Sequence, residues 1–282
     1  MDAKTESNGR LIGRRKVLKA GLAGGFGLVV GATSLSTSTV AAGNRARPGL
    51  ALVIGTDNYA RARDLRTPVR DAQAVAGRLE NLGYRLHGGG VHADPDRATA
   101  LGLFREFAAA VPQDGLAFVY VAGHGVAQSG VTYLIPSDDA ALMEREDLAD
   151  QAIALPVLTA RLAARPGVDS FVLVDACRAN GLRGAGNAVG GSGDLVAPRD
   201  GSLTLIYAAS PGQIAADGDG GQGVLSPFAR AVLHALDAPD RPLVDLFTDV
   251  SLETLRLSGG GQTPFQMQVL AGPPLTGVVP AR

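Results

Sequence analysis

The chain has 282 residues, of which 46% are hydrophobic and 19% are charged, a balance typical of a soluble globular protein. Its formal net charge of −1 argues against a nucleic-acid partner, because nucleic-acid-binding domains usually carry a strong basic excess. Its single cysteine, Cys177, excludes an internal disulfide and zinc sites built on several cysteines.

Residues 1–42 have the features of an export signal. Arg14 and Arg15 precede a segment rich in Gly, Ala, Leu and Val, and Val40–Ala42 supplies the small residues of a cleavage site. The apolar stretch at 20–32 is shorter than the ~20 residues of a membrane span. The pattern resembles a twin-arginine translocation signal, so we expect an exported protein, periplasmic or secreted. The alternatives are a basic disordered arm and an uncleaved anchor.

Strand and helix patterns alternate after the signal. In chain order, the patterns predict strand 50–59, helix 67–84, a weak strand or hairpin at 84–95, helix 96–111 and strand 115–125. They continue with helix 154–165, strand 169–178, a glycine-rich mobile loop at 182–201, strand 202–210, helices 226–236 and 242–257, and strand 264–270. This order favours an α/β fold with an open, mostly parallel sheet covered on both faces. We expect residues 43–282 to form one domain.

Two of the expected strands end in residues with catalytic chemistry. Strand 115–125 runs out into His124, and strand 169–178 runs out into Cys177, 53 residues later. Ligands of an open parallel sheet collect beyond the carboxyl ends of its strands, so neighbouring strands would bring the imidazole and the thiol together. The thiolate would be the nucleophile, and the imidazole would take its proton and later deliver it to the leaving amine. The backbone N–H groups of Gly125 and Cys177 are the expected oxyanion donors.

Each of these residues also has a purely structural interpretation. A lone cysteine at a strand end is often a small core residue, and a lone histidine is usually structural. The combination favours catalysis, because each residue ends its own apolar strand, in His-then-Cys order and about fifty residues apart. No side chain that would orient His124 is evident from the sequence.

The motifs "FVYVAGHG" and "FVLVDACRANG" resemble the His and Cys motifs of the caspase-like cysteine peptidases, particularly the bacterial members related to metacaspases. The similarity runs from about Leu50 to Leu270 and includes "LRTPVRDA", "YLIPSDD" and "GQTPFQMQVLAG". The resemblance implies the caspase-hemoglobinase-like three-layer sandwich and endopeptidase activity. It also implies that Cys177 is the nucleophile and His124 the base.

The resemblance further implies a specificity pocket lined by Asp71 and Asp175. Two carboxylates in one recess attract a guanidinium or an ammonium, so we expect cleavage after Arg or Lys. Alternatively, Asp71 is an exposed first-turn residue that favours the helix dipole, and Asp175 caps nearby amides. A serine that some relatives place two residues before the histidine is Ala122 here.

Ala209 and Ser210 match the segment along which relatives bind the substrate backbone. The alternative is an ordinary core strand. Loop 182–201 matches a region where some relatives are cut, and Arg183 and Arg199 suit self-cleavage by an Arg-directed enzyme.

No cofactor and no metal ligand is assigned. The acidic stretch at 137–150 could supply calcium ligands, but we expect a solvated loop. Residues 217–223 resemble the start of an EF-hand loop whose twelfth position is Phe228 rather than Glu. The expected partner is a protein or peptide substrate, with no nucleic acid and no membrane beyond the signal segment. A catalytically silent binding module, and a related peptidase that cleaves after Asn or Asp, remain as alternatives.

Overall fold

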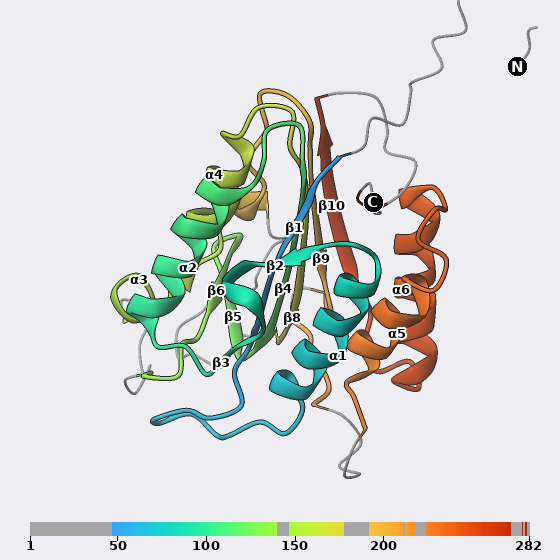
Figure 1. The fold of residues 1–282 in the computed structure, drawn as a ribbon. Helices are drawn as coiled ribbons and strands as arrows, with labels where there is room; N and C mark the ends of the chain where they lie inside the picture. The colour runs from blue at the N-terminus through green and yellow to red at the C-terminus, as the bar shows by residue number, and fades with distance from the viewer. Residues whose placement is uncertain are drawn as a thin grey trace, which may run out of the picture. The chain divides into compact units, whose positions relative to one another are not determined.

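A mixed sheet lies at the centre of the protein, which is seen here in a computed structural model (Figure 1). The structure describes residues 47–139, 147–177, 192–210, 212–217, 224–271, 278 and 280. The expected export signal at 1–42 lies outside these residues, as does Arg183. Among the described residues, no helix is both long and apolar enough to cross a bilayer.

The central sheet is parallel except at one edge. Its strands lie in the order β10-β9-β8-β4-β1-β2, with β3 also pairing with β1. Their bounds are β1 Gly49–Gly55, β2 Arg85–Leu86, β3 His92–Ala93, β4 Leu116–Gly123, β8 Asp169–Ala176, β9 Ser202–Tyr207 and β10 Phe265–Leu270. Only β10 pairs antiparallel, with β9. Since β2 and β3 both pair parallel with β1, the hairpin considered for 84–95 is wrong and two short strands stand there.

Helices cover both faces of this sheet, which confirms the predicted three-layer sandwich. The helices are α1 Pro68–Asn81, α2 Arg97–Ala110, α3 Asp147–Gln151, α4 Pro156–Ala163, α5 Pro227–Ala235 and α6 Leu243–Leu257. Two short 3₁₀ turns are η1 His87–Gly89 and η2 Ser192–Asp194. Helices α1, α5 and α6 lie on one face, and α2 and α4 lie on the other (Figure 1).

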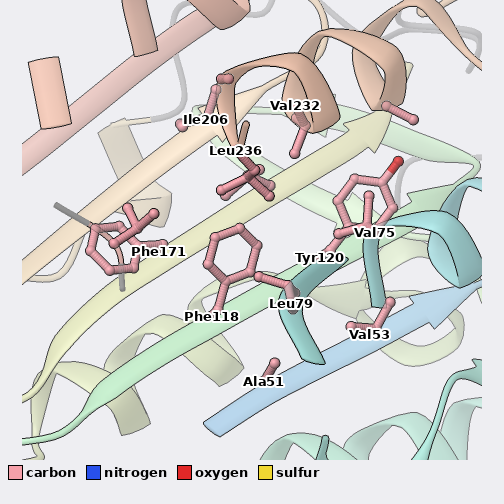
Figure 2. Packing of buried hydrophobic residues seen from close by; sticks show 14 of the residues in the cluster. Ala51, Val53, Val75, Leu79, Phe118, Tyr120, Phe171, Ile206, Val232 and Leu236 are labelled. Atoms are coloured by element: carbon pink, nitrogen blue, oxygen red, sulfur yellow. The ribbon is translucent and has the colours of Figure 1, made fainter. Parts of the chain in front are cut away.

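The strands supply two separate hydrophobic cores, because successive side chains of a strand point to opposite faces. On β4, Phe118 and Tyr120 belong to the core under α1 and α5, whereas Val119 and Val121 belong to the core under α2 and α4. Figure 2 shows the first core, in which Leu79 of α1 and Val232 of α5 lie close to these aromatic rings. Strands buried on both faces explain the continuous apolar runs of the sequence.

A second, small antiparallel sheet follows β4 and was not predicted. It contains β5 Gly125–Gln128, β6 Val131–Leu134 and β7 Ile153–Ala154. The expected strand 115–125 therefore ends at Gly123, and the chain leaves the central sheet at His124. The turn Ser129–Gly130 joins β5 to β6, and both of its residues have positive φ, as a two-residue type I′ turn requires.

The second half of the predicted mobile loop is packed against the domain. Residues 178–191 lie outside the described residues, but 192–194 form η2. There the buried carboxylate of Asp194 accepts hydrogen bonds from the Thr132 amide at 2.8 Å and the Tyr207 hydroxyl at 2.6 Å. Because Asp194 fixes this segment, the loop expected from the glycine-rich composition ends before residue 192 rather than at 201.

Candidate active site

The register of two neighbouring strands brings His124 and Cys177 to one edge of the sheet. Strands β4 and β8 pair in parallel along their full length, and their last pair is Gly123 with Ala176. The next residue of each strand is therefore the histidine or the cysteine. Both residues line one pocket with about 310 Å³ of empty space, measured out to open solvent. The shared edge expected from the sequence is present.

A backbone carbonyl orients the imidazole. Nε2 of His124 lies 2.7 Å from the carbonyl oxygen of Arg63. Because a carbonyl oxygen only accepts, Nε2 carries the hydrogen, and Nδ1 of the neutral ring is the nitrogen with a free lone pair. The sequence could not show this partner, since any residue type supplies a carbonyl.

Tyr59 holds His124 from a second side. Its hydroxyl accepts a hydrogen bond from the His124 amide at 2.7 Å and donates one to the Thr56 carbonyl at 3.1 Å. The two rings lie 4.6 Å apart between centroids. A Cβ at Gly123 would lie 2.6 Å from the Tyr59 hydroxyl, so glycine is needed directly before the histidine.

The loop that carries Tyr59 and Arg63 is itself fixed by a buried carboxylate. Asp139, which is 4% exposed, accepts hydrogen bonds from the amides of Arg61 and Ala62 at 2.9 and 2.8 Å. The amide of Tyr59 donates to the carboxylate of Asp64 at 3.0 Å. Asp139 belongs to the acidic stretch expected to be a solvated loop, yet at this position it is a buried structural residue.

The thiol of Cys177 is half-buried, and its pKa lies above the ordinary value of a thiol. Sγ donates to the carbonyl of Ala215 at 3.5 Å. Burial raises the pKa of the thiol, and the carboxylates of Asp175 and Asp217 raise it further, against the opposing charge of Arg63. A base is therefore needed to remove the proton when the sulfur attacks a substrate.

Asp71 and Asp175 lie in the same pocket and are bridged by Ser226. The Ser226 amide donates to Asp71 at 3.0 Å, and its hydroxyl donates to Asp175 at 2.7 Å. Tyr120 adds a hydroxyl donor to Asp175 at 2.9 Å. Burial raises the pKa of Asp71 to about 6, and burial together with the charge of Asp71 raises the pKa of Asp175 to about 7. Asp71 is 1% exposed, which excludes the alternative of an exposed first-turn residue.

A third carboxylate, Asp217, lines this pocket and was missed by the sequence analysis. It accepts hydrogen bonds from the amides of Arg66 and Thr67, each at about 3.1 Å, and from the Thr67 hydroxyl at 3.2 Å. These two amides directly precede α1, whereas the amide of Val69 in its first turn donates to the carboxylate of Asp57 at 3.0 Å. The side chain of Thr67 makes no capping hydrogen bond to α1, because its hydroxyl donates to Asp217. Thr67 and Asp217 are 150 positions apart, so no local sequence pattern could predict their contact.

The family follows from a comparison of the whole chain with protein-family models. The model described as "Caspase domain" matches residues 48–270. The chain belongs to the caspase domain family. A search of curated protein sequences gave no significant match.

Solved structures share the fold of this caspase domain. One is the protein GSU0716 from Geobacter sulfurreducens, with a TM-score of 0.61 and 14% identity over 83% of this chain and 100% of that chain. Another is caspase-1 from Spodoptera frugiperda, with a TM-score of 0.59 and 16% identity over 80% of this chain and 88% of that chain. At these identities the likeness is one of fold alone.

In this caspase domain, Gly125 lies against the end of β8. A Cβ on Gly125 would lie 2.9 Å from the Ala176 side chain and 3.0 Å from the Cys177 carbonyl oxygen. Only glycine allows the chain after His124 to pass this close to the cysteine. The two residues expected to donate to an oxyanion are thus neighbours in space.

Ala209 and Ser210 lie outside the pocket formed by the other predicted site residues. The side chain of Ala209 is fully buried, and β9, which precedes it, is paired on both sides, with β8 and β10. The Ser210 hydroxyl donates to the Thr263 carbonyl at 2.9 Å, and the Ser210 amide donates to Gln213 at 3.3 Å. Substrate binding at these two residues stays a prediction.

Arg199 lies at the opposite end of the sheet from Cys177. It precedes β9, whose first residue pairs with Asp169 at the start of β8, whereas Cys177 follows the end of β8. The eight residues of β8 span ~26 Å at about 3.3 Å per residue. Arg199 is therefore remote from Cys177 of the same molecule, and self-cleavage at this residue stays a prediction.

The described residues do not fit a calcium site. Among them, no group of three or more His, Cys, Asp or Glu side chains is arranged to hold a metal ion. Both oxygens of Asp139 bind backbone amides, and Asp138 accepts a hydrogen bond from the Arg97 amide at 2.8 Å. No catalytic step is assigned to a metal.

Proposed function

We propose that this caspase domain is a cysteine endopeptidase that cleaves proteins after Arg or Lys. The observation that carries the proposal is the single pocket that combines His124, Cys177 and three carboxylates. The family supports a cysteine peptidase, and the pocket's chemistry supports the basic specificity.

In the first step, the sulfur of Cys177 attacks the carbonyl carbon of the scissile bond. A C–S bond forms while the thiol proton passes to Nδ1 of His124. The negative charge that develops on the carbonyl oxygen would be stabilised by the amides of Gly125 and Cys177, and one such donor is worth ~3 kcal/mol of barrier. When the C–N bond breaks, His124 returns the proton to the amine, which leaves with the C-terminal part of the substrate.

In the second step, water hydrolyses the thioester. His124 takes one proton from the water, the new C–O bond forms, and the C–S bond breaks. The proton returns to the sulfur, and the acid product leaves with its new carboxyl group. Nε2 stays bonded to the Arg63 carbonyl throughout, which stabilises the imidazolium formed in each step.

The three carboxylates account for the specificity. A guanidinium binds a carboxylate through two parallel hydrogen bonds, and an ammonium binds it as a point charge. None of the residues that line the described pocket is a lysine or an arginine that would neutralise the carboxylates internally. The missing hydroxyl at Ala122 leaves one polar contact fewer than in some relatives, and Asp217 adds one.

The test is hydrolysis of fluorogenic peptides by the full-length chain. Substrates ending in Arg or Lys should be cleaved, and matched peptides ending in Asp or Asn should not. Cys177→Ala should abolish cleavage. Equal inactivity of the wild type and this variant on all four peptides would favour a silent binding module, and cleavage after Asn or Asp would overturn the basic specificity.

We also propose that the chain is exported by the twin-arginine route. The paired Arg14 and Arg15 before an apolar segment support this proposal. Replacing both with Lys should retain the protein inside the cell, and unchanged export would contradict the proposal.

A further inference from the structure

A second cavity lies on the other side of His124. It has about 350 Å³ of empty space, measured out to open solvent, and lies between the sheet, α2 and the β5–β6 hairpin. Its apolar walls come from Ile54, Phe104, Val121, Leu134, Ile135 and Ile153. No Asp, Glu, Lys or Arg side chain is among the residues that line it.

The cavity opens at the catalytic histidine. Among its lining residues, only Gly123 and His124 keep more than a small part of their surface accessible, and the others are buried. Most of the accessible surface among the lining residues therefore belongs to Gly123 and His124, and we place the mouth of the cavity there. The carboxylate-lined pocket shares Ala122, Gly123 and His124 with this cavity.

This arrangement fits a substrate that crosses the sheet edge from one pocket to the other. The proposed function, on which this inference rests, places the basic side chain among the carboxylates and the scissile carbonyl at Cys177. His124 must then reach the nitrogen of the next residue to protonate the leaving amine. The side chain of that next residue is thereby brought to the mouth of the apolar cavity.

We infer that this cavity is a subsite for the residue that follows the cleaved bond, and that it takes a short aliphatic side chain such as Val. Burial of an aliphatic group in an apolar cavity is favourable, at roughly 0.8 kcal/mol per CH₂. A charged side chain would be desolvated there without a partner. The 350 Å³ includes open solvent, and the enclosed part is bounded by close-packed core residues, so an aromatic ring would exceed it.

The experiment compares kcat/KM for internally quenched peptides that differ only in the residue after Arg. Full-length protein should cleave the Arg-Val peptide about tenfold faster than the Arg-Gly peptide, because only Val buries a side chain in the cavity. Arg-Asp and Arg-Phe peptides should be cleaved no faster than Arg-Gly.

Two variants change the cavity in opposite directions without touching the reacting groups. Ala100→Leu adds a side chain into the cavity from α2, and it should reduce the Val-to-Gly ratio to about one. Phe104→Leu removes part of the wall and should raise cleavage of the Arg-Phe peptide relative to Arg-Gly. Ala108→Leu is the matched control, since Ala108 is equally buried on α2 but does not line the cavity.

The outcomes separate the two proposals. Cleavage after Arg with equal rates for Val, Gly and Phe would overturn the subsite and leave the peptidase intact. A Val preference that Ala100→Leu and Phe104→Leu leave unchanged would also overturn it. If no peptide is cleaved at all, the result contradicts both the proposed function and the subsite that rests on it.

Discussion

The two cavities beside His124 differ in chemistry although they share one edge of one sheet. On the α1 side, Asp71, Asp175 and Asp217 line the pocket that holds Cys177. On the α2 side, the walls are aliphatic and aromatic. The difference comes from the alternation of side chains along β8. Phe171 and Leu173 face the α1 core, and Asp175 follows them two residues later, whereas the opposite face stays apolar up to Ala176.

In the proposed function, this small difference in strand pattern sets the substrate specificity. We propose that Asp175, on the α1 face at the end of β8, forms a cation site together with Asp71 and Asp217. The other face keeps the apolar composition of a core, and its proposed role as a subsite depends on its position beside His124. Substrate selection before the cleaved bond should thus be electrostatic, and selection after it should be hydrophobic.

Neutralising the carboxylate pocket alone should have the largest effect on activity. Asp175→Asn should lower kcat/KM for Arg substrates roughly 100-fold, because it removes a charge-assisted contact that is worth up to ~3 kcal/mol. The Val-to-Gly ratio after the cleaved bond should stay unchanged. Peptide kinetics measure both ratios, and Asp240→Asn, an exposed acid outside the pocket, is the control. An equal loss of kcat/KM in the control would contradict the role of Asp175 in binding the basic side chain.

A change in pH should titrate one pocket and leave the other unchanged. The raised pKa values of Asp71 and Asp175, about 6 and about 7, mean that both carboxyls become neutral as the pH falls below these values. The ratio of kcat/KM for an Arg substrate to that for its neutral citrulline analogue should therefore fall by at least ~10-fold between pH 7.5 and 5.5. Any effect of pH on His124 and Cys177 is the same for both substrates, so it cancels in this ratio. A flat ratio over this range would contradict the proposed role of the carboxylates.

Tyr59→Phe should weaken the support of His124, the residue beside which both cavities lie. The variant loses the hydrogen bond that holds the His124 amide, so kcat should fall about fivefold with little change in KM. Both substrate ratios should stay as in the wild type. Tyr84→Phe is the matched control, because it removes a buried hydroxyl that bonds to the Val278 carbonyl far from the site. A rise in KM without a fall in kcat would argue against positioning.

Asp139→Asn should have the smallest effect on activity, because this residue acts through the loop that carries Arg63. An amide can accept only one of the two backbone hydrogen bonds, and its NH₂ group faces the other donor. The free energy of unfolding should fall by ~1–3 kcal/mol in urea titrations. Asp138→Asn next to it is the control, since that carboxylate is exposed. Equal stability of the two variants would contradict the role of Asp139 in fixing the loop that carries Arg63.

Much of the fold was predictable from the sequence, because buried parallel strands leave long apolar runs. The strands that carry His124 and Cys177, and the helix that carries Asp71, lie within a few residues of their predicted bounds. The β5–β6–β7 sheet was missed because its strands have only two to four residues and β5 directly continues the pattern of β4. The antiparallel direction of β10 also has no signature in its own residues.

The candidate site was predictable only where it depends on side chains at strand ends. The Arg63 carbonyl is invisible in a sequence, and Asp217 and Ser226 reach the pocket through contacts about 150 residues apart. Tyr59 lies in a predicted strand that in fact ends at Gly55, so its turn toward His124 could not be foreseen. Long-range packing, rather than local propensity, decides these positions.

Covalent labelling of the full-length chain tests the central claim most directly. A peptidyl arginyl chloromethylketone should alkylate Cys177 once, as read by intact mass and peptide mapping. The His124→Ala variant should react far more slowly, and the aspartyl analogue should label neither protein at a comparable rate. Labelling that is equally fast without His124, or equally fast with the aspartyl reagent, would contradict a base-assisted thiol beside a cation pocket.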